Sequence, residues 1–280
     1  MSNPDGFIMQ HMTVEEVREA FKSTKTAILP VGVIEQHGYH MPLYVDVYNA
    51  YEIAKRVSPL AGCLVAPPVQ YSFSGGTLPG TLDISPQLLS LMLMEICGSL
   101  ANSGIENIVI LLGHGGTENQ KATYDAADMF FRRNPHYRHV KLALVPFTDL
   151  APSVTEAFEK RDFHAGELET SMMLYWHPEE VRDRSKWVTD SQELMDIFYQ
   201  DQDAYQVQAK PLDDPAVCPV IIQHPDMEVG VMCCVEDLQN ANAEYGKRIV
   251  DECVANLVDL IKKLEASDYP EVLKKYFVHR

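Results

Sequence analysis

The sequence predicts an α/β protein, built as an α/β/α sandwich around a mainly parallel sheet. Short apolar runs alternate with longer segments of helical periodicity, and each run is followed by a loop of Gly, Pro or polar residues. A chain of 280 residues, of which 46% are hydrophobic, can bury one large core. We therefore expect residues 1–280 to form a single domain.

Four apolar segments are expected to be strands of the sheet. Each is rich in β-branched or aliphatic residues, as buried parallel strands are. They span Thr26–Gly32, Cys63–Tyr71, Asn107–Gly113 and Lys141–Thr148.

Helical segments fill the gaps between these strands. They span Val14–Lys22, Ala50–Val57, Pro86–Ser103 and Asn119–Arg132, and a long amphipathic helix is expected over Asp237–Leu264. Thr117, with Gln120 three residues later, predicts a capping box. The polar, proline-broken stretch 182–219 is expected to be a surface excursion or an insertion on the substrate side.

The composition excludes several classes of function. A formal charge of −17 disfavours binding to nucleic acid and to anionic membranes. The N-terminus has no basic flank before an apolar run, and no segment reaches the roughly 18 apolar residues of a membrane span. The six cysteines lack CxxC spacing, which is typical of thiols in a reducing compartment. We expect a cytoplasmic protein whose partner is a small molecule.

Residues with metal-binding chemistry follow the first predicted strand. In a parallel α/β sheet, ligands bind beyond the carboxyl ends of the strands. Glu35 and His37 are two residues apart, so in extended backbone both side chains project to the same side. Asp46 follows nine residues after His37, and we expect a loop to fold it back onto the pair.

A second group follows the strand at 107–113. His114 lies in a glycine turn that opens a helix, where the backbone can approach a ligand closely and free amides can hold an anion. Glu118 has a simpler explanation, because an acid in the first helical turn favours the helix dipole.

The third group is the segment Asp162–Ser171, in which His164, Glu167 and Glu169 stand at the mouth of a helix. Helical geometry separates the two glutamates by about 200° around the axis. Only one of them can therefore face a shared pocket. The mixed set of imidazole and carboxylate groups suits Zn²⁺ or Mn²⁺ better than a thiolate site would.

These three motifs, in this order, resemble the creatininase family. They are Glu35-Gln-His-Gly with Asp46, Gly113-His-Gly-Gly, and His164-Ala-Gly-Glu-Leu-Glu-Thr-Ser, and the resemblance covers about residues 13–265. It implies an α/β/α sandwich, two divalent metal ions bridged by Asp46, and hydrolysis of small cyclic amides or formamides. It also implies a homo-oligomer, since relatives are hexamers.

The resemblance implies a role for each residue of the motifs. The metal ligands would be Glu35, His37, Asp46, His114 and Glu169, with Glu118 and Glu167 in reserve. The reserve is needed because creatininase carries a glutamate at the position of Gly116. His164 would be a proton shuttle, since imidazole titrates near neutral pH.

Three functions remain open at this point. The first is opening of a cyclic amide or formamide C–N bond by a metal-activated water. The second uses the same metals to break a C–C bond in a cyclic ketone such as a keto-inositol. The third is a non-catalytic α/β protein that binds a small ligand or metal. A serine nucleophile is disfavoured, because no Gly-x-Ser-x-Gly elbow is present.

Overall fold

A parallel sheet of five strands lies at the centre of the computed structural model, which describes residues 6–76, 78–201, 204, 208–210, 220–222 and 227–267. The strand order is β1-β3-β2-β4-β5, and every neighbouring pair is parallel. The strands are β1 Phe7–Ile8, β2 Thr26–Val31, β3 Leu64–Val65, β4 Asn107–Leu112 and β5 Lys141–Pro146.

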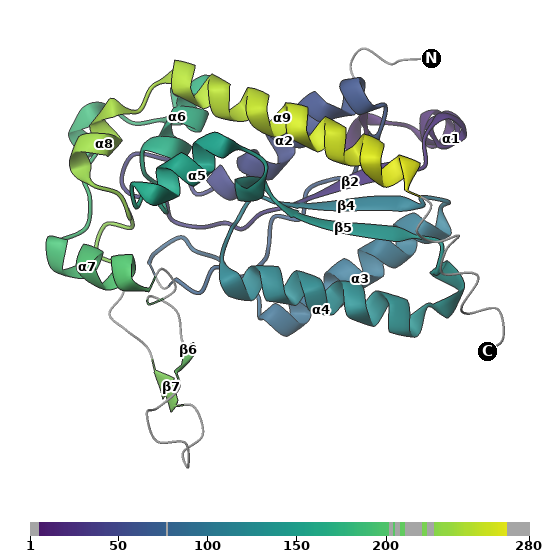
Figure 1. The fold of residues 1–280 in the computed structure, drawn as a ribbon, viewed down its shortest axis with the longest axis horizontal. Coiled ribbons are helices and arrows are strands. Elements are labelled where there is room, and N and C mark those ends of the chain that lie inside the picture. The colour runs from purple at the N-terminus through teal and green to yellow at the C-terminus, as the bar shows by residue number, and fades with distance from the viewer. Residues whose placement is uncertain are drawn as a thin grey trace.

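Helices cover both faces of this sheet (Figure 1). On one face lie α2 Val45–Ala61, α5 Pro152–Glu159, α6 Glu167–Trp176 and α9 Ala243–Ala266; on the other lie α3 Pro86–Asn102 and α4 Thr117–Arg133. The shorter helices are α1 Val14–Ser23, α7 Gln192–Gln200 and α8 Val235–Asn240, and β6 Gln208–Lys210 pairs with β7 Val220–Ile222. The predicted α/β class is confirmed.

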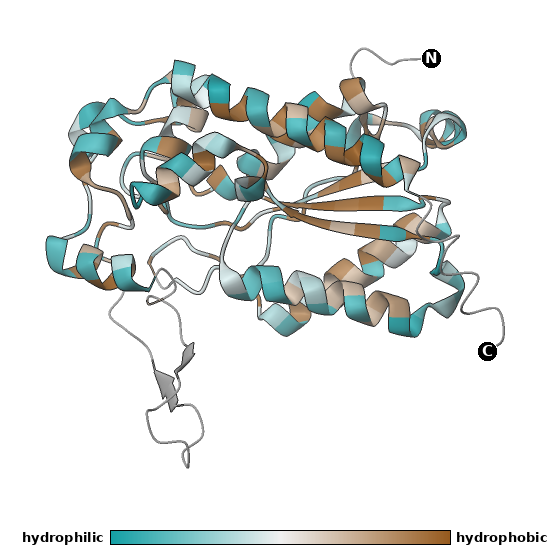
Figure 2. Ribbon diagram, viewed as in Figure 1, coloured by the Kyte–Doolittle hydropathy of each residue, from teal (hydrophilic) through white to brown (hydrophobic). Residues whose placement is uncertain are grey.

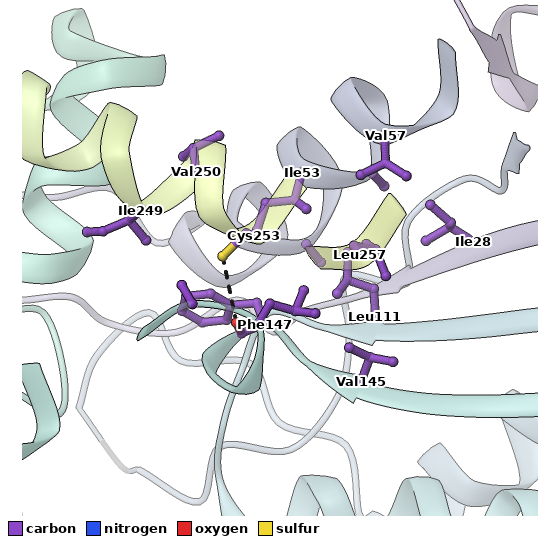
Figure 3. Packing of buried hydrophobic residues seen from close by; sticks show 14 of the residues in the cluster. Ile28, Ile53, Val57, Leu111, Val145, Phe147, Ile249, Val250, Cys253 and Leu257 are labelled. Carbon is purple, nitrogen blue, oxygen red and sulfur yellow. Dashed lines mark hydrogen bonds between the residues drawn. The ribbon is translucent and has the colours of Figure 1, made fainter. Parts of the chain in front are cut away.

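The two cores follow from the alternation of side chains along the strands. Ile28, Val109 and Leu111 face the cluster under α2 and α9 (Figure 3), whereas Leu29 and Ile110 face the cluster under α3 and α4. In Figure 2 the strands are brown along their length, and the outer surfaces of the helices are largely teal. A sheet buried on both faces explains why these strands read as continuous apolar runs.

Two local predictions were wrong. The strand expected over Cys63–Tyr71 is interrupted after β3, because Pro67 and Pro68 have no N–H to donate to a ladder. Pairing with β2 resumes at a single parallel bridge between Val69 and Val31. The capping box at Thr117 is absent, because Gly116 is the N-cap of α4 and no side chain caps the helix. The Gln120 amide donates instead to the carbonyl of Gly115.

Three other segments differ in their bounds. The helix expected at Ala50–Val57 begins at Val45, so Asp46 lies in its first turn and not in a loop before it. The long helix expected over Asp237–Leu264 is divided into α8 and α9, with Asn242 as the N-cap of α9. The segment 182–219 is partly packed, since Trp187 and Phe198 are buried, while residues 202–203, 205–207 and 211–219 lie outside the described residues.

Two glycines allow the first turn of α2 to lie against the ends of β2 and β4. A Cβ at Gly32 would lie 2.5 Å from the backbone nitrogen of Val47, and a Cβ at Gly113 would lie 1.9 Å from the carbonyl oxygen of Asp46. Both distances are far below van der Waals contact. The start of α2, with Asp46, is therefore held at the carboxyl end of the sheet.

A third glycine, Gly246, allows α9 to approach α6, and this contact can be tested. A Cβ at Gly246 would lie 1.9 Å from the carbonyl oxygen of Ser171. We expect Gly246→Ala to lower the free energy of unfolding in urea by about 1–3 kcal/mol, because overpacking forces the helices apart.

Gly98→Ala is the matched control. Gly98 lies inside α3, and a Cβ there would meet nothing within 4 Å. This change should raise the free energy of unfolding by about 0.5–1 kcal/mol through helix propensity. Equal effects of the two substitutions would show that the α6–α9 contact is not close.

Candidate metal centre

Five acidic and histidine side chains meet at the carboxyl end of the sheet. Glu35 and His37 lie in the loop after β2, Asp46 in the first turn of α2, His114 in the loop after β4 and Glu169 in the first turn of α6. None is more than 8% exposed. Charged groups so deeply buried require partners of opposite charge.

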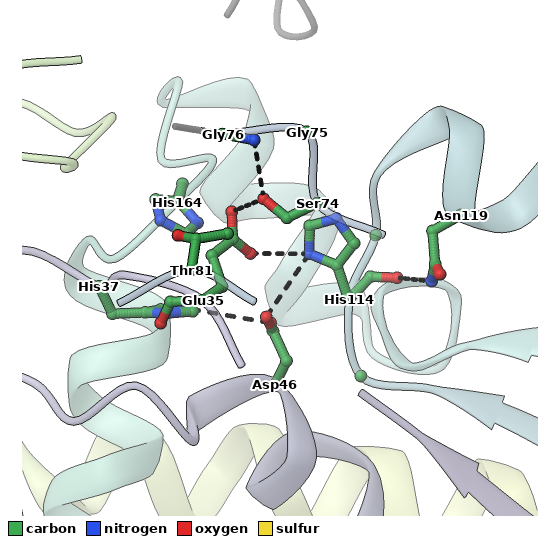
Figure 4. A network of polar contacts seen from close by, with 12 residues as sticks. Glu35, His37, Asp46, Ser74, Gly75, Gly76, Thr81, His114, Asn119 and His164 are labelled. Carbon is green, nitrogen blue, oxygen red and sulfur yellow. Dashed lines mark hydrogen bonds and ion pairs between the residues drawn. The ribbon is translucent and has the colours of Figure 1, made fainter. Parts of the chain in front are cut away.

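The five side chains form two groups that share Asp46. Figure 4 shows four of them: Glu35, His37, Asp46 and His114. In one group, His114 Nδ1 lies 3.0 Å from Glu35 Oε2 and 3.6 Å from Asp46 Oδ2. In the other, His37 Nε2 lies 3.7 Å from Asp46 Oδ1 and 3.6 Å from Glu169 Oε2. Each oxygen of Asp46 thus faces a different histidine.

The atoms of both groups fit divalent cations. Three of them, Glu35 Oε2, Asp46 Oδ2 and His37 Nε2, are buried and have no hydrogen-bond partner. An unpaired buried polar group costs about 1–3 kcal/mol. Zinc bonds of about 2.0–2.2 Å place neighbouring ligand atoms roughly 3.4 Å apart in a tetrahedral site, close to the separations above. The set can hold two cations, one in each group.

The cluster also attracts positive charge in the form of protons. Burial alone would lower the pKa of His37, but the carboxylates of Glu169 and Asp46 raise it to about 10. Burial raises the pKa of Asp46 to about 7 against the opposing effect of the histidines. The pKa of Glu169 falls to about 2, because His37 outweighs the effect of burial. Cations that bind here must therefore displace protons.

Neighbouring polar groups orient these side chains. His37 Nδ1 lies 3.1 Å from the carbonyl oxygen of Glu35, which leaves Nε2 to face the cluster. The hydroxyl of Ser74 donates to Glu35 Oε1 at 2.5 Å, and the amide of Asn49 donates to Glu169 Oε1 at 2.9 Å. Partners of this kind fix metal ligands and tune their basicity.

The sequence prediction missed Ser74 and Asn49. Asn49 lies three residues after Asp46, on the same face of a helix whose neighbouring residues are apolar. A polar residue on that face was the available signal. Ser74 lies in a glycine-rich loop outside any regular element, and its position carries no periodic signal.

His164 lies beside the cluster. Its ring centroid is 4.4 Å from that of His37, and its Nε2 is 3.0 Å from the carbonyl oxygen of Gln36. Two residues near His164 in the chain, Arg161 and Ala165, have left-handed φ angles of 64° and 53°. Non-glycine residues in that region cost energy, and they persist where the surrounding structure imposes them.

The two reserve glutamates lie outside the cluster. Glu118 forms an ion pair with Lys121, at 3.7 Å, and its side chain is 39% exposed. Glu167 is half-buried and lies near Lys160. The loop that follows β4 therefore contributes His114, and no carboxylate, to the two groups described above.

A cavity of about 270 Å³ opens onto the cluster. The residues that line it include Asp46, His114, His164 and Glu169 of the cluster and its neighbour, together with Phe147, Phe158, Phe163, Thr117, Gln120 and Thr148. Among the described residues that line it, none is a lysine or an arginine. Its size suits a small molecule.

The fold and the cluster define an α/β protein with buried imidazole and carboxylate groups at the carboxyl end of its sheet. Comparison with known proteins is more specific. The model of the creatininase family, described as creatinine amidohydrolase, matches residues 10–261. The chain belongs to this family of metal-dependent hydrolases.

Several curated relatives are similar to the chain. Creatinine amidohydrolase of Pseudomonas putida is 27% identical over 84% of the chain and 88% of that protein. Mycofactocin precursor peptide peptidase of Mycolicibacterium smegmatis is 30% identical, over 88% of each chain. 3-Dehydro-scyllo-inosose hydrolase of Thermotoga maritima is 30% identical over 41% of the chain and 38% of that protein.

Solved creatininase structures have the same fold. A mutant creatininase of type II superposes with a TM-score of 0.71 at 26% identity, over 93% of this chain and 99% of the other. One creatininase structure at 24% identity is described as containing Mn and another as Zn-Zn type.

Among the described residues, no helix is long and apolar enough to cross a membrane.

The choice among the glutamates can be tested by metal analysis. We expect Glu169→Gln to lower the metal content of the purified protein, because it removes the carboxylate nearest His37 Nε2. Glu118→Gln is the control and should leave metal content unchanged, since Glu118 faces Lys121. The reverse result would move the ligand to the turn after His114.

Proposed function

We propose that the protein is a dinuclear-metal hydrolase that opens a small cyclic amide, or cleaves a formamide, at the C–N bond. The observation that carries this proposal is the pair of buried groups that share Asp46. Glu35 and His114 would hold one divalent ion, His37 and Glu169 the other, and Asp46 both. Zn²⁺ and Mn²⁺ suit this donor set, and both occur in the names of structures of relatives.

When bound, such cations acidify a water molecule and polarise a substrate carbonyl. The protein itself supplies the remaining functions. The carboxylates of Glu35, Asp46 and Glu169 supply the negative charge of the site, and all three are buried. Ser74 and Asn49 keep the carboxylates in place through their hydrogen bonds.

His164 would move the proton in this reaction. It lines the cavity and belongs to neither of the two groups that share Asp46, although its ring nitrogen also lies within reach of Glu35 and His37 in a third group of potential ligands. Burial and the neighbouring His37 lower the pKa of His164 below its ordinary value of 6.5. A neutral imidazole can accept a proton from water and deliver it to the departing nitrogen.

The cavity favours a small substrate that is neutral or positively charged. It has about 270 Å³ of space, and the described residues that line it include two histidines, His114 and His164, but no lysine or arginine. A phosphate or carboxylate far from the metals would meet Asp149 and Asp162 and no counter-charge. Two relatives align along most of the chain: one, of Pseudomonas putida, is named creatinine amidohydrolase, which favours a small amide, and the other, of Mycolicibacterium smegmatis, is named a precursor peptide peptidase.

Cleavage of a C–C bond in a cyclic ketone is the second candidate. The Thermotoga maritima relative, which is named for a keto-inositol substrate, favours it. The same metals and the same proton shuttle would serve this reaction. The non-catalytic alternative has lost its support, because the chain belongs to a family of hydrolases.

We propose that the chain acts as a single domain and assembles into a homo-oligomer, with a hexamer as the form that the family resemblance suggests. We propose a cytoplasmic location, which is consistent with cysteines that are mostly buried and free among the described residues.

The experiment that tests the function is a screen of the metal-loaded protein against lactams, cyclic ureides, formamides and keto-inositols. Ring opening or formate release should appear with one class, and the class separates C–N from C–C cleavage. Asp46→Ala is the control. It should lose both metal ions and all activity, because one bridging carboxylate serves both groups. Loss of a single ion would exclude the bridge.

A second variant tests the proton shuttle. His164→Ala should retain both metal ions and lower kcat by about 10²–10⁴, the usual contribution of a positioned acid or base. Because the folded-state pKa of His164 is lowered, its limb of the pH–rate profile should lie below pH 6.5 and flatten in the variant. Loss of metal, or a rate within about threefold of wild type, would make His164 a ligand or a bystander.

A further inference from the structure

A buried carboxylate outside the metal cluster binds four consecutive backbone amides. Asp190 is 5% exposed. Its Oδ1 accepts hydrogen bonds from the amides of Glu228 and Val229, at 2.5 and 2.9 Å. Its Oδ2 accepts from Gly230 and Val231, both at 2.8 Å. Each oxygen therefore takes two N–H groups, and the carboxylate fixes residues 228–231 as one unit.

Only a carboxylate can make this set of bonds. Hydrogen bonds to an ionised acceptor are roughly twice as strong as neutral ones. An asparagine in the same place would keep one accepting oxygen, but its NH₂ group would face two N–H donors. The arrangement is thus sensitive to the loss of a single oxygen atom at a nearly constant side-chain volume.

The loop fixed by Asp190 lies against Gln36, the residue between the candidate ligands Glu35 and His37. Gly230 has a left-handed φ of 84° and packs against Gln36, where a Cβ would lie 1.6 Å from Oε1. Two residues further on, Met232 forms backbone hydrogen bonds with the segment that contains His164. The amide of Phe163 donates to the carbonyl of Met232 at 2.9 Å, and the amide of Met232 donates to the carbonyl of His164 at 2.8 Å.

Gln36 connects the same loop to His164 from the other side. Its side-chain amide donates to the sulfur of Met227 at 3.7 Å and lies 3.1 Å from His164 Nε2. Its backbone carbonyl lies 3.0 Å from the same nitrogen. His164 is therefore held on its backbone by Met232 and on its ring by Gln36, and both contacts depend on where the loop lies.

We propose that Asp190 is a positioning residue for His164, acting through residues 228–232. This proposal rests on the proposed function, since it assigns to Asp190 the placement of the proton shuttle. His164 lies between Arg161 and Ala165, whose left-handed backbone is unfavourable. A segment under such strain relaxes when its restraints are removed, and the pair with Met232 is one of those restraints.

The alternative is that Asp190 only stabilises the fold. A stabilising residue would lower the melting temperature and leave the turnover of the folded enzyme unchanged. A positioning residue would lower kcat at a temperature where the variant is folded and fully loaded with metal. A displacement of about 1 Å in a catalytic group can cost 10²-fold in rate.

The test uses the full chain with Asp190→Asn, and Asp183→Asn as the matched control. Asp183 is an exposed aspartate seven residues away whose carboxylate accepts from the amide of Ser185 and does not contact the loop. Asp190→Asn should lower kcat by about 10- to 100-fold with KM nearly unchanged. Metal content, measured by elemental analysis, should stay at the wild-type value. Asp183→Asn should match the wild type in both measurements.

A double variant separates positioning from a general loss of order. If Asp190 acts through His164, adding Asp190→Asn to His164→Ala should have little further effect on kcat, because the group it places is already gone. Full additivity of the two losses would overturn the proposal. Asp190→Glu, which restores a carboxylate, should recover more activity than Asp190→Asn.

Hydrogen exchange followed by mass spectrometry provides a readout that does not need a substrate. In Asp190→Asn, amides 228–232 and 163–165 should exchange at least tenfold faster, while those of α9 keep the wild-type rate. Faster exchange at 228–231 alone, with 163–165 unchanged, would overturn the coupling to His164. If the screen finds no substrate, the proposed function fails, and this experiment still decides whether Asp190 controls the segment around His164.

Discussion

The close approach of the α2 N-terminus to the ends of β2 and β4 is the constraint on which the site depends. Gly32 and Gly113 have no side chain, and any Cβ there would overlap the backbone of α2. The approach places the Asp46 carboxylate between the loops that follow the two central strands. One oxygen then faces His114 and the other faces His37. Without these two glycines, the two groups would not share a carboxylate.

The chemistry of the cluster follows from charge in a dry environment. Three carboxylates and two imidazoles lie together with little access to water. Each carboxylate raises the pKa of the nearby histidine, and each histidine lowers the pKa of a nearby carboxylate, so the groups titrate as a set. The surrounding hydrogen bonds from Ser74 and Asn49 satisfy the oxygens that face away from the histidines. The cluster thus favours positive charge at two positions, one in each of the groups that share Asp46.

Sequence alone predicts the parts of this protein that depend on periodicity and on strand ends. Glu35, His37 and His114 could be selected because each follows an apolar run that becomes a central strand. The position of Asp46 on a helix could not, because the close packing that starts α2 at Val45 depends on glycines distant in sequence. The strand over 63–71 is interrupted for a local reason, because Pro67 and Pro68 lack N–H groups between β3 and the bridge at Val69. Asp190 lies in a segment without periodicity, so its four amide partners are visible only in three dimensions.

The two groups that share Asp46 also join parts of the chain that are far apart in sequence. Glu35 and Glu169 are separated by more than a hundred residues, on opposite sides of three βα units. The unfolded chain cannot present such a set without closing long loops, at an entropic cost of a few kcal/mol. Ions that bind the folded chain and not the unfolded one shift the folding equilibrium by mass action. Metal supply would then govern how long each molecule survives in the folded state, and a cell could clear metal-starved copies by proteolysis without any dedicated signal.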